Sequence, residues 1–195
     1  MGKIKYTKEI KDFFKKSPIV SINSLKKIIL NKKGNTIYVY LVINKLIKKK
    51  EIIRLTKGYY TIHEDPTLAV FCFKPAYLGL EDALSSHNLW EQETIPIIIT
   101  TKKIRPGIRV ISETNVLIRR ISPRYFFGFD YYKQGDFYYP ISDIEKTFID
   151  MVYFRQPIDE EVIEEFKKRI NKKKLKTYLK KYPKRVRARI EEKLK

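Results

Sequence analysis

Four charged residues in the C-terminal half have the types that a metal-dependent nuclease uses: Asp136, Asp143, Glu145 and Lys146. Such an enzyme holds its carboxylates and lysine on adjoining strands around one divalent ion. Glu145 and Lys146 are neighbours, however, and Ser142 or Asp143 is suited to cap a helix that begins here. The side chains of Glu145 and Lys146 are therefore expected to point in different directions, which disfavours a catalytic metal site.

Other catalytic and metal-binding patterns are missing from the sequence. It has one cysteine and two histidines, Cys72, His63 and His87, which are too few for a metal-ligand cluster. It also has no Gly-rich phosphate loop, no Gly-x-Ser-x-Gly turn and no histidine-based dyad. Cys72 lies in an apolar run, where a buried and unreactive thiol is expected. The sequence thus predicts a protein that is not an enzyme and that needs no cofactor.

Basic residues gather at the two ends of the chain, which has 195 residues and a formal charge of +20. Residues 1–62 carry 16 Lys and Arg against three acids, and residues 171–195 carry 12 against two. Residues 63–170 are nearly neutral, with 14 basic and 17 acidic side chains. This distribution favours an anionic partner such as a phosphate backbone. Because no stretch is apolar enough to span a bilayer or to form a signal peptide, a cytoplasmic protein without a membrane partner is expected.

The basic N-terminal segment begins with the pattern of two helices. Apolar residues recur at helical spacing in residues 5–16, and Pro18 ends that helix. A short extended piece over residues 19–21 leads into the second helix, for which Ser21 or Asn23 is available as the N-cap.

The third segment, residues 36–50, is ambiguous because its first half is β-branched and aromatic enough to form a strand. Its continuation favours a helix, since five apolar residues fall on one helical face: Val39, Val42, Ile43, Leu46 and Ile47. Residues 52–55 and 59–62 then alternate around a turn that contains Gly58, which is the pattern of a hairpin. Three helices and a hairpin in this order predict a winged helix-turn-helix domain over residues 1–64.

In a winged helix, the third helix enters the major groove of duplex DNA and the hairpin approaches the backbone or the minor groove. The side chains predicted to reach base edges or adjacent phosphates are Asn35, Thr36, Tyr38, Asn44 and Lys45, with Tyr40 joining them if the helix is rotated. Those predicted to contact phosphates are Lys32, Lys33, Lys48 and Lys57. Winged helices also serve as protein-interaction scaffolds, but here the charge and the pattern coincide in one segment, which favours DNA.

Residues 65–158 have the pattern of a mixed α/β domain, so the fold class is predicted to be α+β. Strands are expected at residues 95–101, 108–112, 116–122 and 125–132, and a further strand is expected after a turn at 134–136. Helices are expected at residues 80–88 and from Ser142 onward. The pattern of residues 159–195 predicts basic C-terminal helices, in which apolar residues form a stripe on one face and the charged residues lie on the other. Whether these helices also contact phosphate is left open by the pattern.

Three stretches carry a resemblance to a known family: residues 46–60, 76–89 and 141–151. Across residues 5–155 the chain resembles the antitoxin component of abortive-infection E (AbiE) systems, also called predicted transcriptional regulators of viral defence. At the position of Lys50 in this chain the family usually has Gly. At the position of Asn88 the family often has Gly. Both positions are expected helix C-caps, where Asn is the accepted substitute for Gly and Lys is strained.

The resemblance implies a DNA-binding repressor whose second domain counters a nucleotidyltransferase-like toxin from the same operon. It thus implies an autoregulating antitoxin of a phage-defence operon. The residues themselves support the DNA-binding half of this expectation. An RNA-binding protein with the same basic modules is an alternative, because tyrosines interleaved with lysines suit base stacking: Tyr38, Tyr40, Tyr59 and Tyr60. The metal-dependent nuclease is the weaker alternative.

Overall fold

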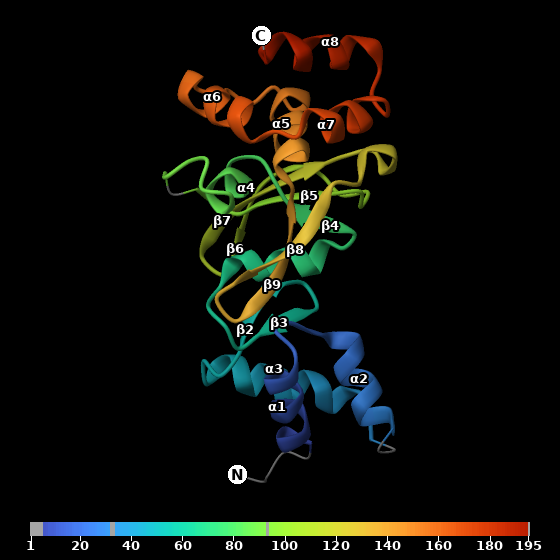
Figure 1. Ribbon diagram of the computed structural model, residues 1–195. Coiled ribbons are helices and arrows are strands. Elements are labelled where there is room, and N and C mark those ends of the chain that lie inside the picture. Colours follow the sequence, from blue (N-terminus) through green and yellow to red (C-terminus); the bar gives the residue numbers. More distant parts are fainter. Residues whose placement is uncertain (1–5, 32–33, 93, 195) are drawn as a thin grey trace. The chain divides into compact units, whose positions relative to one another are not determined.

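The computed structural model describes residues 6–31, 34–92 and 94–194, which form a mixture of helices and two β-sheets (Figure 1). The predicted α+β class is therefore confirmed. The chain divides into two compact units, each with its own contacts. The first unit contains the described residues up to Cys72 together with Val110–Thr114, and the second contains the rest of the described chain.

The first unit contains three helices and a small antiparallel sheet. In chain order its elements are α1 (Thr7–Lys16), β1 (Val20–Ser21), α2 (Ile22–Asn31), α3 (Ile37–Lys48), β2 (Ile53–Thr56) and β3 (Tyr59–Thr61). The strands lie in the order β1-β3-β2. Ser21 is the cap that α2 uses, because its Oγ accepts a hydrogen bond of 3.0 Å from the backbone N–H of Ser24. The predicted helices and hairpin are present, and β1 adds a third strand.

Helix α3 resolves the ambiguity of the third segment in favour of a helix. Val39, Val42, Ile43 and Leu46 are buried in a core shared with α1 and α2. A strand would turn successive side chains to opposite faces and would expose half of this apolar set. Packing of one helical face therefore outweighs the strand propensity of the β-branched residues.

Most of a six-stranded mixed sheet with the order β6-β7-β5-β4-β9-β8 belongs to the second unit, while the end of β6 and the start of β7, within Val110–Thr114, are grouped with the first. The strands of this sheet are β4 (Ala76–Leu78), β5 (Ile97–Thr100), β6 (Gly107–Ile111), β7 (Thr114–Arg120), β8 (Phe129–Gln134) and β9 (Phe137–Ser142). β5 is buried at every position and lies between β7 and β4, as its continuous apolar run predicts. Three-residue β4 was not predicted, and β8 begins at Phe129, because η2 (Pro123–Tyr125) occupies part of the expected strand.

Helices complete the second unit, and Figure 1 shows α5 to α8 gathered at one end of its sheet. The helical elements are η1 (Pro66–Phe73), which crosses the boundary of the units, α4 (Glu81–Ser86), α5 (Ile144–Tyr153), α6 (Glu160–Arg169), α7 (Lys172–Leu179) and α8 (Lys184–Lys193). Leu175, Leu179 and Ile190 are buried in the same core as Tyr77 and Ile99 of the sheet. The basic C-terminal helices thus share the hydrophobic core of the second unit. Among the described helices, none has the length and apolar character needed to cross a membrane.

Candidate nucleic-acid interface

The side of α3 that faces away from the core carries aromatic, apolar, amide and basic groups and no carboxylate. Its exposed residues are Ile37, Tyr38, Tyr40, Leu41, Asn44 and Lys48. Tyr40 and Leu41 are 47% and 50% exposed, which is more than a helix in a packed core would leave open. We call this set the α3 face. Its composition suits contact with a partner that carries negative charge and flat or apolar groups.

Asn35 and Thr36 lie at the start of α3. Asn35 Oδ1 accepts a hydrogen bond of 2.9 Å from the backbone N–H of Ile37, so this oxygen satisfies a free donor of the first helical turn. Thr36 is partly exposed and its side chain makes no capping hydrogen bond. A bidentate contact with adenine needs both the oxygen and the amide nitrogen of an Asn side chain. The bond to Ile37 fixes the orientation of the Asn35 amide and leaves its oxygen one lone pair, so a bidentate contact with a base edge is possible only in this fixed orientation.

The two tyrosines of α3 have different surroundings. The Tyr38 ring meets the Tyr6 ring edge to face, with 6.3 Å between the ring centroids. The Tyr40 ring lies 4.9 Å from the Lys26 ammonium of α2, which is a cation–π contact. Tyr40 therefore connects the α3 face to a lysine of the preceding helix, and the two residues together offer an aromatic edge and a positive charge.

The predicted phosphate-contacting lysines lie on two elements. Lys48 is exposed near the end of α3, whereas Lys45 is only half exposed. Lys57 is exposed in the turn between β2 and β3, which is the tip of the hairpin. Lys32 and Lys33 lie outside the described residues. The structure thus places Lys48 and Lys57 in positions from which each side chain can extend freely to an anion.

The acids of the first unit do not lie on α3. Lys11 of α1 pairs with Glu51, and the hydrogen bond from Lys11 lowers the pKa of the Glu51 carboxyl. Lys15 lies 3.6 Å from Asp12 within α1. These carboxylates are held close to lysines of α1, so the positive charge of the α3 face is not neutralised by a carboxylate on the same helix.

Both residues that are expected to be strained or substituted C-caps, Lys50 and Asn88, have left-handed backbone. Lys50 follows the end of α3 with φ 56°, and Asn88 follows the end of α4 with φ 53°. The backbone N–H of Lys50 donates to Ile47 at 2.9 Å and that of Glu51 donates to Leu46 at 2.9 Å, which is a Schellman ending. The expectation that Lys is strained at this C-cap is therefore supported by the backbone geometry.

The charged residues around the start of α5 form a fixed network. Asp143 caps the helix by accepting a hydrogen bond of 2.8 Å from the backbone N–H of Lys146. Tyr178 Oη donates to the other Asp143 oxygen at 2.8 Å, and burial together with this hydrogen bond raises the pKa of Tyr178 to about 12. Lys174 Nζ lies 3.2 Å from Asp143 and 3.0 Å from Glu145. These contacts attach α7 to the first turn of α5.

Lys146 points away from that network and into the core. Its side chain is fully buried and forms an ion pair with Asp150, which is equally buried. Tyr77 Oη donates to Asp150 at 2.7 Å, and Lys146 Nζ donates to Tyr182 Oη at 3.3 Å. Burial lowers the pKa of Lys146 and raises that of Asp150, while the charge of each residue opposes the shift of the other. The buried pair connects α5 to a sheet strand and to the segment between α7 and α8.

The four residues considered for a nuclease are therefore divided among three places. Asp143 and Glu145 face Lys174, Lys146 faces Asp150, and Asp136 is exposed in the turn between β8 and β9. Throughout the described chain, no group of three or more His, Cys, Asp and Glu side chains could hold a metal ion. Cys72 is buried, as its apolar surroundings predict. The four residues therefore do not converge on one place in the described structure.

Comparisons with known proteins support the fold. No family model and no curated protein matches the chain. The structure is similar to the crystal structure of the RV2827C protein from Mycobacterium tuberculosis, with a TM-score of 0.60 and 10% sequence identity. The match covers 97% of this chain and 75% of that one. At this identity the similarity concerns the fold alone.

Proposed function

We propose that the first unit is a winged helix-turn-helix domain that binds duplex DNA through α3, and that the protein regulates transcription. The α3 face carries this proposal, because a polar and aromatic helix surface without carboxylates lies in a segment with a charge of +13. The order of three helices followed by a hairpin supports the assignment. In this proposal α3 enters the major groove, and Lys57 at the hairpin tip contacts the phosphate backbone.

Binding to duplex DNA is expected to fall steeply with salt concentration. If lysines such as Lys48 and Lys57 contribute to about six phosphate contacts, the slope of log K against log salt should be near −5. Fluorescence anisotropy with a labelled duplex at several salt concentrations measures this slope. Lys57→Ala should flatten it by roughly one unit, because one phosphate contact is removed.

Two results of the salt titration would contradict the proposal. A slope near zero for the wild-type protein would remove its electrostatic basis. Tighter binding of a single-stranded RNA of equal length would favour the RNA-binding alternative, in which Tyr38 and Tyr40 stack on bases. A duplex and a single strand of the same length must therefore be compared at every salt concentration.

We further propose that the second unit binds a protein partner, a nucleotidyltransferase-like toxin encoded beside this chain. Support comes from the resemblance of residues 76–89 and 141–151 to AbiE antitoxins and from the near-neutral charge of residues 63–170. The two resembling stretches also contact each other within the unit. Leu78 of β4 pairs with Ile141 of β9, and His87 Nε2 lies 2.6 Å from the backbone oxygen of Ser142.

The product of the adjacent gene is expected to co-purify with the full chain. The double variant Lys48→Ala and Lys57→Ala should lose DNA affinity but retain the partner, since both substitutions lie in the first unit. Co-expression with one affinity-tagged chain, followed by nuclease treatment, provides the measurement. Loss of the partner in the same proportion as loss of DNA would mean that nucleic acid bridges the two proteins, which would contradict the proposed division of roles.

A further inference from the structure

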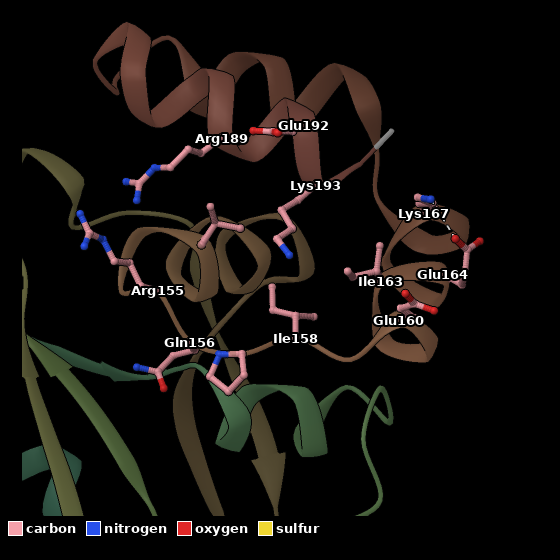
Figure 2. Close-up of a pocket in the computed structure, with 12 residues that line it drawn as sticks. Arg155, Gln156, Ile158, Glu160, Ile163, Glu164, Lys167, Arg189, Glu192 and Lys193 are labelled. Carbon is pink, nitrogen blue, oxygen red and sulfur yellow. Dashed lines mark hydrogen bonds and ion pairs between the residues drawn. The ribbon is translucent and has the colours of Figure 1, made fainter.

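A groove of about 920 Å³ lies in the second unit, lined by the end of α5, the segment after it, α6 and α8 (Figure 2). Its apolar lining includes Val152, Pro157, Ile158 and Ile163. The volume is within the range of about 300–1,000 Å³ found for sites that bind small ligands. The DNA-binding and partner-binding proposals give this groove no role.

Cations without a carboxylate partner line part of this groove. Among the described residues, Arg155, Arg189 and Lys193 form no ion pair, whereas Lys167 in the same groove lies 2.8 Å from Glu164. Figure 2 shows the side chains of Arg155 and Arg189 extending to the same side of the groove, away from Glu160 and Glu164 on α6. The lining therefore carries two guanidinium groups without an ion pair in the described chain on one side and two carboxylates of α6 on the other, with Glu192 of α8 as a third carboxylate.

Arg189 also has an unused hydrogen-bond donor. Its Nε is buried and has no hydrogen-bond partner among the described residues. A buried donor without an acceptor costs free energy, and such groups in folded proteins usually meet a ligand, an ion or water. A guanidinium group presents its donors in a planar fork that matches the oxygens of a carboxylate or phosphate. The terminal nitrogens of Arg189, beyond the buried Nε, therefore suit an oxyanion.

Arg155 occupies a position where glycine would be favoured. It follows the end of α5 with φ 57°, and the backbone N–H groups of Arg155 and Gln156 donate to Val152 at 3.2 Å and to Met151 at 2.9 Å. This is a Schellman ending, in which a residue with a side chain is strained. The Arg155 side chain is exposed and forms no ion pair in the described chain that would offset this strain. Local strain of this kind is often retained where a side chain binds a ligand.

We propose that the groove binds a small organic oxyanion, with a carboxylate or phosphate group between Arg155 and Arg189. The apolar body of the ligand lies against Val152, Ile158 and Ile163. The two guanidinium groups supply charge-assisted hydrogen bonds, and the apolar lining supplies the rest of the affinity. The groove residues belong to the second unit, whereas the α3 face belongs to the first.

Titration of the full chain with phenyl phosphate and with benzoate tests the proposal. Both probes carry an oxyanion and an aromatic body, whereas inorganic phosphate lacks the body and benzyl alcohol lacks the charge. Arginine Nε–H resonances in NMR spectra report contact, and the melting temperature reports stabilisation. We expect saturable shifts with at least one of the two aromatic anions, and weaker binding of inorganic phosphate and benzyl alcohol.

Three single variants separate ligand binding from folding. Arg155→Gly and Arg189→Gln should each weaken binding by roughly tenfold or more, the effect of losing a charge-assisted contact. Arg155→Gly should not lower the melting temperature of the free protein, because glycine is favoured in its backbone conformation. Lys167→Gln, which removes a groove lysine that is already paired, should bind as the wild type does. Unsaturable binding of both aromatic anions, or unchanged affinity in both arginine variants, would overturn the proposal.

Discussion

Replacing Asp150 with leucine is expected to destabilise the second unit by about 3–5 kcal/mol, the largest effect expected of any single substitution considered for this protein. The change leaves the Lys146 ammonium fully buried without its anion, next to the hydroxyls of Tyr77 and Tyr182. Lys146→Met should have a similar cost, because it leaves the Asp150 carboxylate with only the hydroxyl of Tyr77 as its partner. Urea unfolding followed by the fluorescence of Trp90, the single tryptophan, measures both.

The double variant Lys146→Met and Asp150→Leu should be far more stable than the sum of its parts. The ion pair gains its attraction only after both charges have lost their water, so replacing both charges with apolar groups removes the penalty together with the attraction. The same loss of water lowers the pKa of Lys146 and raises that of Asp150, because burial disfavours the charged form of each group. Additive losses in the double-mutant cycle would show that the two charges are not coupled.

A matched control is available on α6. Lys167 and Glu164 form a lysine–carboxylate pair within one helix too, three residues apart rather than four, but their side chains are 30% and 60% exposed. Lys167→Met is therefore expected to cost less than about 1 kcal/mol, because water screens the pair. A similar loss from Lys146→Met would indicate that the buried pair contributes no more than a surface pair.

Much of the fold could be predicted from the sequence because its long elements have clear periodicity. The helices over residues 7–16 and 37–48 bury the apolar faces that their spacing indicates. β4 was missed because it has three residues, all buried, and therefore shows neither alternation nor a run of strand length. Its place beside β5 and β9 depends on pairing with residues far away in the chain, which local pattern cannot indicate.

The site was harder to predict, because the role of a side chain depends on its partners. Asn35 has the same chemistry whether it contacts a base or caps a helix, and only its 2.9 Å contact with Ile37 separates the two roles. Gly34 precedes α3, and a Cβ at this position would lie 2.7 Å from Ile29 and from the Tyr6 hydroxyl, a close approach that local sequence cannot indicate. The sequence did not indicate that Arg155 lines a groove. The residues of α8 that line the same groove lie more than thirty positions away in the sequence.

On the α3 face, Asn44 is the residue whose replacement should most change the choice of DNA sequence. It is exposed, it lies one helical turn from Tyr40 and from Lys48, and its side chain makes no hydrogen bond with the described part of the chain. Its amide nitrogen and oxygen are both available to pair with one adenine edge. Asn44→Ala is therefore expected to lose about 1–3 kcal/mol on the preferred sequence and little on random duplex.

The experiment first selects a preferred duplex from a random pool and then measures the affinity of each variant for that duplex and for a scrambled one.

Asn35→Ala should lower the stability of the first unit by about 1 kcal/mol, because the hydrogen bond to the start of α3 is lost. Asn35→Ser keeps an acceptor and should retain most of that stability. Lys48→Ala should weaken binding to both duplexes by the same factor, because a lysine that contacts phosphate does not distinguish bases. Equal losses on the two duplexes for Asn44→Ala would mean that α3 binds DNA without recognising its sequence.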